Sequence, residues 1–342
     1  MQKVESSSSA PSKPGITLPA SISGKGTPWI FLGLIALAAI LAPTVLGRYG
    51  MTIGITLLYS AYLASAWNVV AGYAGQLSLA HGAFFGVGAY ASVYFNTQWG
   101  ISPWIGMVFG ALISGAIAAG LGAVSFRYKL TGAYFAIATL AFAEILRVLI
   151  NSSQYLGQGS GLVINLQEPG WWIMQFNDPK YFYFIFLTMM IGILFVLRWL
   201  SRSQFGYRLA AIRESEIVAE SLGINPRREK LLAFVLSAIL VAPAGSVYSQ
   251  FLLFVDPPTF LGLTVAVAII LPALVGGTGT ILGPLIGAVV LVGVTELLSH
   301  FALRPGISLF AYGMILILSV LLMPRGIWPT VHDAWVRLRA KQ

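Results

Sequence analysis

Residues 181–200 read YFYFIFLTMMIGILFVLRWL, and Arg198 is the one charged side chain among them. A helix of about 20 residues, at about 1.5 Å per residue, matches the thickness of the hydrocarbon core of a bilayer. A helix also satisfies its own backbone hydrogen bonds, which lipid cannot do. The stretch therefore predicts a membrane-spanning α-helix.

Similar apolar stretches occur along the rest of the chain. The predicted spans are residues 29–46, 51–71, 77–95, 103–124, 133–152, 181–200, 231–252, 259–276, 281–299 and 306–323. Apolar residues make up 57 % of the 342 residues and charged residues 9 %, whereas soluble domains have about 45–50 % and about 25 %. We therefore expect an all-α integral membrane protein, a polytopic helical bundle of about ten transmembrane helices.

The composition divides the chain into three parts. Residues 1–27 hold a serine run with scattered prolines and lysines, which is typical of a disordered cytoplasmic tail. Residues 28–324 form the predicted transmembrane domain, whose one large cytoplasmic loop is residues 201–230. Residues 325–342 form a basic cytoplasmic C-terminal tail.

Basic residues collect on one side of the predicted bundle. With both termini in the cytoplasm, sixteen Lys and Arg fall on the cytoplasmic side and three outside, and Arg147 lies within a span. Cytoplasmic loops of membrane proteins carry such an excess. Orientation in the lipid bilayer thus explains the net charge of +9, and no nucleic-acid partner is expected.

Several classes of active site are excluded by what the sequence lacks. It has no cysteine and three histidines far apart, so a metal or thiol site is not expected. It has no phosphate-binding G-x-x-x-x-G-K-[ST] loop and no hydrolase motif. We therefore expect no catalytic residue and no cofactor in this chain.

The large cytoplasmic loop predicts a docking element. Residues 207–222 contain strong helix formers with apolar positions at helical spacing, and Gly223 suits the C-cap. A second helix is expected to begin near Arg227. Acidic and basic side chains alternate here, whereas a helix on lipid headgroups would present a basic face. The mixed charge favours docking into a protein groove, through the side chains of Arg213, Glu214, Glu216 and Glu220 together with Gly223.

Glycine forms a second pattern, in residues 72–91 (GYAGQLSLAHGAFFGVGAYA) and 276–287 (GGTGTILGPLIG). Small residues let helices approach closely, and glycine-broken helices in two halves of a transporter indicate a transport pathway and an internal repeat. Glycine is also frequent in membrane helices generally, so the pattern alone leaves both interpretations open. The glycines assigned to helix packing or breaks are Gly72, Gly82, Gly276, Gly277, Gly279, Gly283 and Gly287.

Two ionisable groups, Glu144 and Arg147, lie three residues apart within one predicted span. Charged residues inside a membrane indicate function by default. Residues at this spacing share one helix face, so the two groups can also neutralise each other. The lone His81 on an apolar segment favours helix packing over a ligand role.

Four blocks together resemble a known family: residues 72–91, residues 134–144 (YFAIATLAFAE), residues 213–225 (RESEIVAESLGIN) and residues 276–287. They are similar, in this order, to permease subunits of branched-chain amino acid ABC importers, and the second and third blocks resemble the M-type subunit. The resemblance runs from about residue 29 to 328.

The resemblance implies an assembly in the cell inner (cytoplasmic) membrane. An M-type permease pairs with a second, related permease as a heterodimer. Two ABC ATPase subunits, which use ATP and Mg²⁺, dock from the cytoplasm, and a periplasmic substrate-binding protein delivers the substrate. The loop around residues 213–223 would then be the coupling helix, and Gly157 to Gly161 lie on the side where the delivery protein arrives.

The substrate is expected to be a branched-chain amino acid, moved inward by alternating access. Helix N-termini near residues 72–78 could bind its carboxylate. The substrate-pathway candidates are Tyr73, Gly75, Gln76, Ser78, His81 and Glu144. Relatives of the family carry urea or short-chain amides, which no spacing here excludes. A self-sufficient secondary transporter or channel is the alternative from another class, and a membrane-embedded enzyme lacks a visible catalytic cluster.

Overall fold

The computed structural model describes residues 42–43, 47–300, 313–314 and 326–331 of the chain. Six helical segments in this part are long and apolar enough to cross a membrane. They are Arg48–Tyr73, Pro103–Arg127, Gly132–Ser152, Lys180–Arg202, Pro226–Leu252 and Pro257–Gly276. The chain is therefore a mostly helical, polytopic membrane protein, as its composition predicts.

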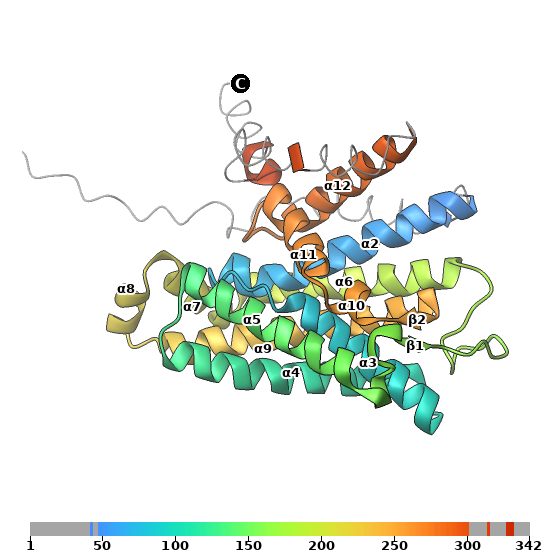
Figure 1. Ribbon diagram of the computed structural model, residues 1–342. Helices are drawn as coiled ribbons and strands as arrows, with labels where there is room; N and C mark the ends of the chain where they lie inside the picture. The colour runs from blue at the N-terminus through green and yellow to red at the C-terminus, as the bar shows by residue number, and fades with distance from the viewer. Residues whose placement is uncertain (1–41, 44–46, 301–312, 315–325, 332–342) are drawn as a thin grey trace, which may run out of the picture.

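The elements follow one another as an almost unbroken series of helices (Figure 1). In chain order they are α2 (Arg48–Asn68), η1 (Val69–Tyr73), α3 (His81–Trp99), α4 (Pro103–Arg127), α5 (Gly132–Ser152), η2 (Gln154–Leu156), η3 (Gln158–Ser160), β1 (Leu162–Val163), α6 (Lys180–Arg202), α7 (Gln204–Glu214), α8 (Glu216–Ser221), α9 (Pro226–Leu252), β2 (Phe254–Val255), α10 (Pro257–Leu261), α11 (Leu263–Gly276) and α12 (Gly283–His300). The pairing of β1 with β2, antiparallel and two residues long, departs from an all-α fold.

The predicted spans agree with these helices except at a few points. Residues 29–46 and 306–323 lie outside the described part of the chain, so the expected total of ten stays a prediction. α3 begins at His81, later than the predicted start at residue 77. Its last turns carry Asn96, Thr97 and Gln98, which makes it less apolar than the six spans. α12 is apolar over Gly283–Leu298.

Helices α3, α4 and α9 form the centre of the bundle, and small residues let their backbones approach closely. Gly245 of α9 faces the carbonyl oxygen of Phe85, and Gly88 of α3 faces that of Ala242. The hydroxyl of Ser246 donates to the carbonyl of Gly88 at 2.8 Å. A side chain larger than glycine would not fit at either crossing.

Aromatic rings join this centre to α2 and α10. Tyr59 of α2 stacks on Tyr248 of α9 with ring centroids 4.5 Å apart, and Phe85 of α3 stacks on Phe260 of α10 at 5.4 Å. Helices α6, α11 and α12 then pack on α2. α3 is therefore covered by protein on several sides, which explains why it carries the buried polar residues His81 and Ser92. Thr97 and Gln98, at its end, are exposed.

Contacts between loops agree with the predicted sides of the membrane. Ser102 donates its hydroxyl to the carbonyl of Trp172 at 2.5 Å, and Tyr49 donates to Glu296 Oε2 at 2.6 Å. Ser102, Trp172 and Tyr49 belong to loops predicted to lie outside, as do the paired strands β1 and β2. Glu296 belongs to the predicted span 281–299, near its predicted outer end. Figure 1 shows these strands at one end of the bundle and α7 and α8 at the other.

We predict that Gly245→Ala destabilises the protein by about 1–3 kcal/mol, because an added methyl group in a packed core forces its neighbours apart. The new Cβ would overlap the Phe85 carbonyl oxygen and lie 3.0 Å from Ala89 N. The control is Gly120→Ala in α4, where nothing lies within 4 Å; alanine there favours the helix by about 1 kcal/mol. Thermal unfolding in detergent measures both, and equal midpoints would contradict the close crossing.

Candidate functional site

Three segments that are distant in sequence meet at the predicted cytoplasmic end of the bundle. They are the end of α2 with the turn that follows it, the turn between α11 and α12, and the end of α7. We call the cluster at their meeting point the glycine node. Its residues are Asn68, Gly72, Gly75, Arg213, Gly279 and Thr280.

Asn68, the last residue of α2, bridges α2 to the α11–α12 turn. Its amide nitrogen Nδ2 donates to the carbonyl of Thr280 at 2.9 Å. Its oxygen Oδ1 accepts from the backbone N–H of Gly279 at 2.8 Å. The side chain is fully buried, so both bonds form away from water, where leaving either group unpaired would cost about 1–3 kcal/mol. Sequence reasoning missed Asn68, although an amide inside an apolar span is itself a signal.

The local backbone makes room for this bridge. α2 continues into a π-helical turn, η1, a form often found at functional sites. A Cβ on Gly72 would overlap Asn68 Oδ1 and lie 2.5 Å from Gly279 N. Gly75 has φ +67°, in the left-handed region that favours glycine. The chain therefore needs glycine at both positions.

Arg213 connects the node to the large cytoplasmic loop. Its Nη1 donates to the carbonyl oxygen of Gly72, and its Cγ lies 3.1 Å from the position of a Cβ on Gly75. A Cβ on Gly279 would overlap the same guanidinium. Arg213 thus places a positive charge beside the carboxyl ends of α2 and α11, where helix dipoles favour a cation.

The large loop forms two short helices, α7 and α8, where the sequence predicted one. The break is at Ser215, which is extended at φ −159° and ψ 114°. Its Oγ accepts from Val218 N at 3.4 Å and caps α8. Gly223 follows α8 with φ +82°, which suits the predicted C-cap. α9 begins at Pro226, close to the predicted Arg227.

Two ion pairs hold these short helices against α9. Lys230 Nζ lies 2.5 Å from Glu216 Oε2, and Arg208 Nε lies 3.4 Å from Glu229 Oε1. The Lys230 side chain is 3 % exposed, so its ammonium group is shielded from water and needs the carboxylate of Glu216 as a partner. Part of the mixed charge that favoured docking therefore acts within the chain. Glu214 and Glu220 stay exposed.

The exposed surface of α8 is apolar as well as acidic. Leu209 and Ile212 of α7 are buried, but Ile217 is 81 % exposed and Leu222 is 73 % exposed. Side chains of this kind at the tip of a loop outside the membrane are typical of a protein contact. We call Ile217, Val218 and Leu222 the α8 tip.

The predicted substrate-pathway residues near α3 lie inside the chain. Tyr73, Gln76, Ser78 and His81 are buried, whereas Gly75 is exposed. Trp67 Nε1 donates to the Ser78 carbonyl at 2.9 Å, which fixes the turn after α2.

His81 closes a short hydrogen-bond chain between α3, α9 and α2. The Ser237 hydroxyl donates its hydrogen to the carbonyl oxygen of Ala66, with Oγ and O 2.7 Å apart. His81 Nε2 lies 2.7 Å from the same hydroxyl and must therefore donate to it. The histidine ring also meets Phe84 and Phe234 edge to face, so in this structure it packs helices together.

The remaining predicted glycines lie at close helix contacts. A Cβ on Gly82 would lie 3.1 Å from Ala266 N. Between α11 and α12, Gly276 faces Gly283, and Gly287 faces the Pro272 carbonyl. Gly277 and Gly279 form the turn between these helices, with φ +118° and +78°. Glycine thus serves both packing and turns, and the two glycine-rich segments contact each other at the node.

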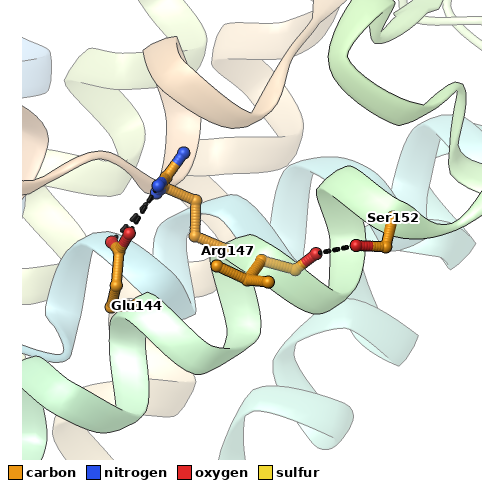
Figure 2. A network of polar contacts seen from close by, with 4 residues as sticks. Glu144, Arg147 and Ser152 are labelled. Carbon is orange, nitrogen blue, oxygen red and sulfur yellow. Dashed lines mark hydrogen bonds and ion pairs between the residues drawn. The ribbon is translucent and has the colours of Figure 1, made fainter.

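Glu144 and Arg147 form an ion pair on α5, as their spacing predicts. Arg147 Nε donates to Glu144 Oε2 at 2.9 Å, and Nη2 donates to Oε1. Figure 2 shows the two side chains reaching toward each other along one face of the helix. They lie apart from the glycine node. Among the described residues, no three His, Cys, Asp or Glu gather as a metal site would require.

Comparisons with known proteins agree with this arrangement. The family described as "Branched-chain amino acid transport system / permease component" matches residues 50–321. The chain is 29 % identical to the high-affinity branched-chain amino acid transport system permease protein LivM of Salmonella typhimurium, over 93 % of this chain and 79 % of LivM. It is 26 % identical to LivH of the same organism, over 81 % and 92 %, and 25 % identical to the L-arabinose ABC transporter permease protein AraH of Azospirillum brasilense, over 88 % and 87 %. No solved structure matches the chain significantly.

The family match covers most of the chain, including both glycine-rich segments, the loop with α7 and α8, and all of α5. The chain therefore belongs to the permease components of branched-chain amino acid ABC transporters, as a transport subunit that is not an enzyme and whose transport uses ATP in partner ATPases.

Proposed function

We propose that this permease moves branched-chain amino acids inward across the cytoplasmic membrane. Both named branched-chain relatives support this substrate, and the chain contains no phosphate-binding loop of its own. In this proposal it spans the membrane ten times, both termini lie in the cytoplasm, and a second permease completes the pair. A periplasmic substrate-binding protein delivers the amino acid on the side of β1 and β2.

The observation that carries the mechanism is the contact of Arg213 with Gly72, Gly75 and Gly279 in the glycine node. In the proposal, an ATPase subunit binds the α8 tip and the acidic residues Glu214 and Glu220. Movement of α8 acts on α7, whose last turn holds Arg213. Arg213 then acts on the turns that follow α2 and α11 together, because its guanidinium touches Gly72 of η1 and Gly279 of the α11–α12 turn. Transport thereby couples to ATP use through one side chain.

We predict that Arg213→Ala uncouples ATP hydrolysis from uptake. Loss of a charged hydrogen bond costs about 1.5–3 kcal/mol, which corresponds to about tenfold or more in the coupled step. The measurement is substrate uptake per ATP hydrolysed by the whole assembly in proteoliposomes. Arg227→Ala, at an exposed arginine at the start of α9, is the matched control. A normal ratio in Arg213→Ala would remove the node from the coupling route.

A separate prediction concerns docking at the α8 tip. Leu222→Asp should greatly reduce the amount of ATPase subunit that co-purifies with the permease, because a charge at an apolar contact must lose water on binding. Leu166→Asp is the control, since Leu166 is also an exposed leucine but belongs to the opposite end of the bundle. Equal ATPase recovery from both variants would argue against docking at this tip.

Uptake assays test the substrate. We predict that cells without this gene lose uptake of labelled leucine and keep uptake of labelled urea and L-arabinose. Loss of urea uptake alone would assign the chain to a urea or short-chain amide importer, and loss of arabinose uptake alone to a sugar importer. Ion-driven flux through the purified chain by itself would favour a secondary transporter or channel.

A further inference from the structure

One face of α5 is exposed along the whole helix. Its members recur every three or four residues, which places them on a single line down the helix. They are Tyr134, Ile137, Ala141, Glu144 and Val148. α5 is also the least covered of the six candidate spans. We call this line the α5 seam.

The ion pair between Glu144, a member of the α5 seam, and its neighbour Arg147 argues against a seam that faces lipid. Glu144 lies eight residues before the end of α5 at Ser152, which is about 12 Å along the helix axis. Even with Arg147 bonded to it, its side chain is 51 % exposed and that of Arg147 is 30 % exposed. Groups of this kind within a membrane face protein or water rather than hydrocarbon.

The described residues near the C-terminus pack away from α5. The described chain reaches the end of α12 at His300, and after residues 313–314 it is described again from Gly326, which packs on Gly277 at the end of α11. Both points therefore belong to the α11–α12 pair, which packs on α2, whereas α5 packs on α3, α4 and α10. Toward the other terminus, Figure 1 shows the start of α2 away from α5.

We propose that the α5 seam is the surface on which the second permease subunit packs, with the Glu144–Arg147 pair enclosed in that interface. This rests on the proposed function, in which two related permeases form the pair. One organism, Salmonella typhimurium, has two permeases that are both similar to this chain. A seam at this spacing accepts a helix crossing at about 20°. Tyr134 and Ile137 supply apolar contact, Ala141 permits close approach, and the partner helix presents a polar group to the ion pair.

Photo-cross-linking tests the surface directly. The chain has no cysteine, so Ala141→Cys gives it a single attachment site for a benzophenone maleimide, which is attached to the purified permease before the assembly is reconstituted. The controls are Leu112→Cys in α4 and Phe195→Cys in α6, at exposed positions on other spans. We expect Ala141→Cys to cross-link to the second permease at least tenfold more than either control.

Each of the other cross-linking results would contradict one part of the proposal. A cross-link from Leu112 or Phe195 but not from Ala141 would refute the α5 seam and leave the permease pair standing. A cross-link from Ala141 to a second copy of this chain would refute the related partner. An assembly in which no second permease is present would refute the proposed pair itself.

Variants of the Glu144–Arg147 ion pair test the same interface by a second measurement, the co-purification of the partner permease. Removal of one member leaves an unpaired charge inside the interface, whereas removal of both does not. Glu144→Gln and Arg147→Gln singly should each lower the amount of partner permease that co-purifies by about tenfold, and the double variant should restore most of it. Equal recovery from all three variants would place the pair outside the interface.

Discussion

The buried amide of Asn68 is the contact on which the predicted cytoplasmic end of this permease depends. It joins residues 211 positions apart in the sequence. Helix ends leave backbone groups without partners, and a membrane supplies no water for them. Asn68 satisfies an N–H and a carbonyl of the α11–α12 turn, while Arg213 satisfies a carbonyl after α2. The two helix ends can therefore lie together with these three backbone groups paired.

Glycine has two physical roles here, and they are found in different places. In α3 and α9 it removes side-chain volume, so Gly88 and Gly245 meet carbonyl oxygens of neighbouring helices. In the turns at Gly75, Gly277 and Gly279 it permits positive φ. The first role makes the centre of the bundle rigid, because close packing leaves no space to move. The second allows tight turns around two side chains, Asn68 and Arg213.

Much of the fold could be predicted from local sequence, since hydrophobic runs and charge bias act along the chain. The ends of α4, α5 and α6 agree with the predicted spans within a few residues. The helix break at Ser215 was missed, because a serine within strong helix formers is compatible with helix or with capping. The partners of Asn68 and the Glu216–Lys230 pair depend on folding at a distance, which no local pattern encodes. Glu144 and Arg147 were paired correctly because their contact lies within one helix.

The node and the centre of the bundle differ in how easily they can change. The contacts among α3, α4 and α9 are extensive and mostly apolar, with a few hydrogen bonds such as that of Ser246 to the Gly88 carbonyl, so these helices can move together as one unit. The contacts of Arg213 and Asn68 are few and directional, and a hydrogen bond is lost when its geometry shifts. Two arrangements separated by a small free energy are what a switch requires. We infer that a rigid centre joined to a polar node lets a push on α8 reorient α2 and α11 without disturbing the packed core.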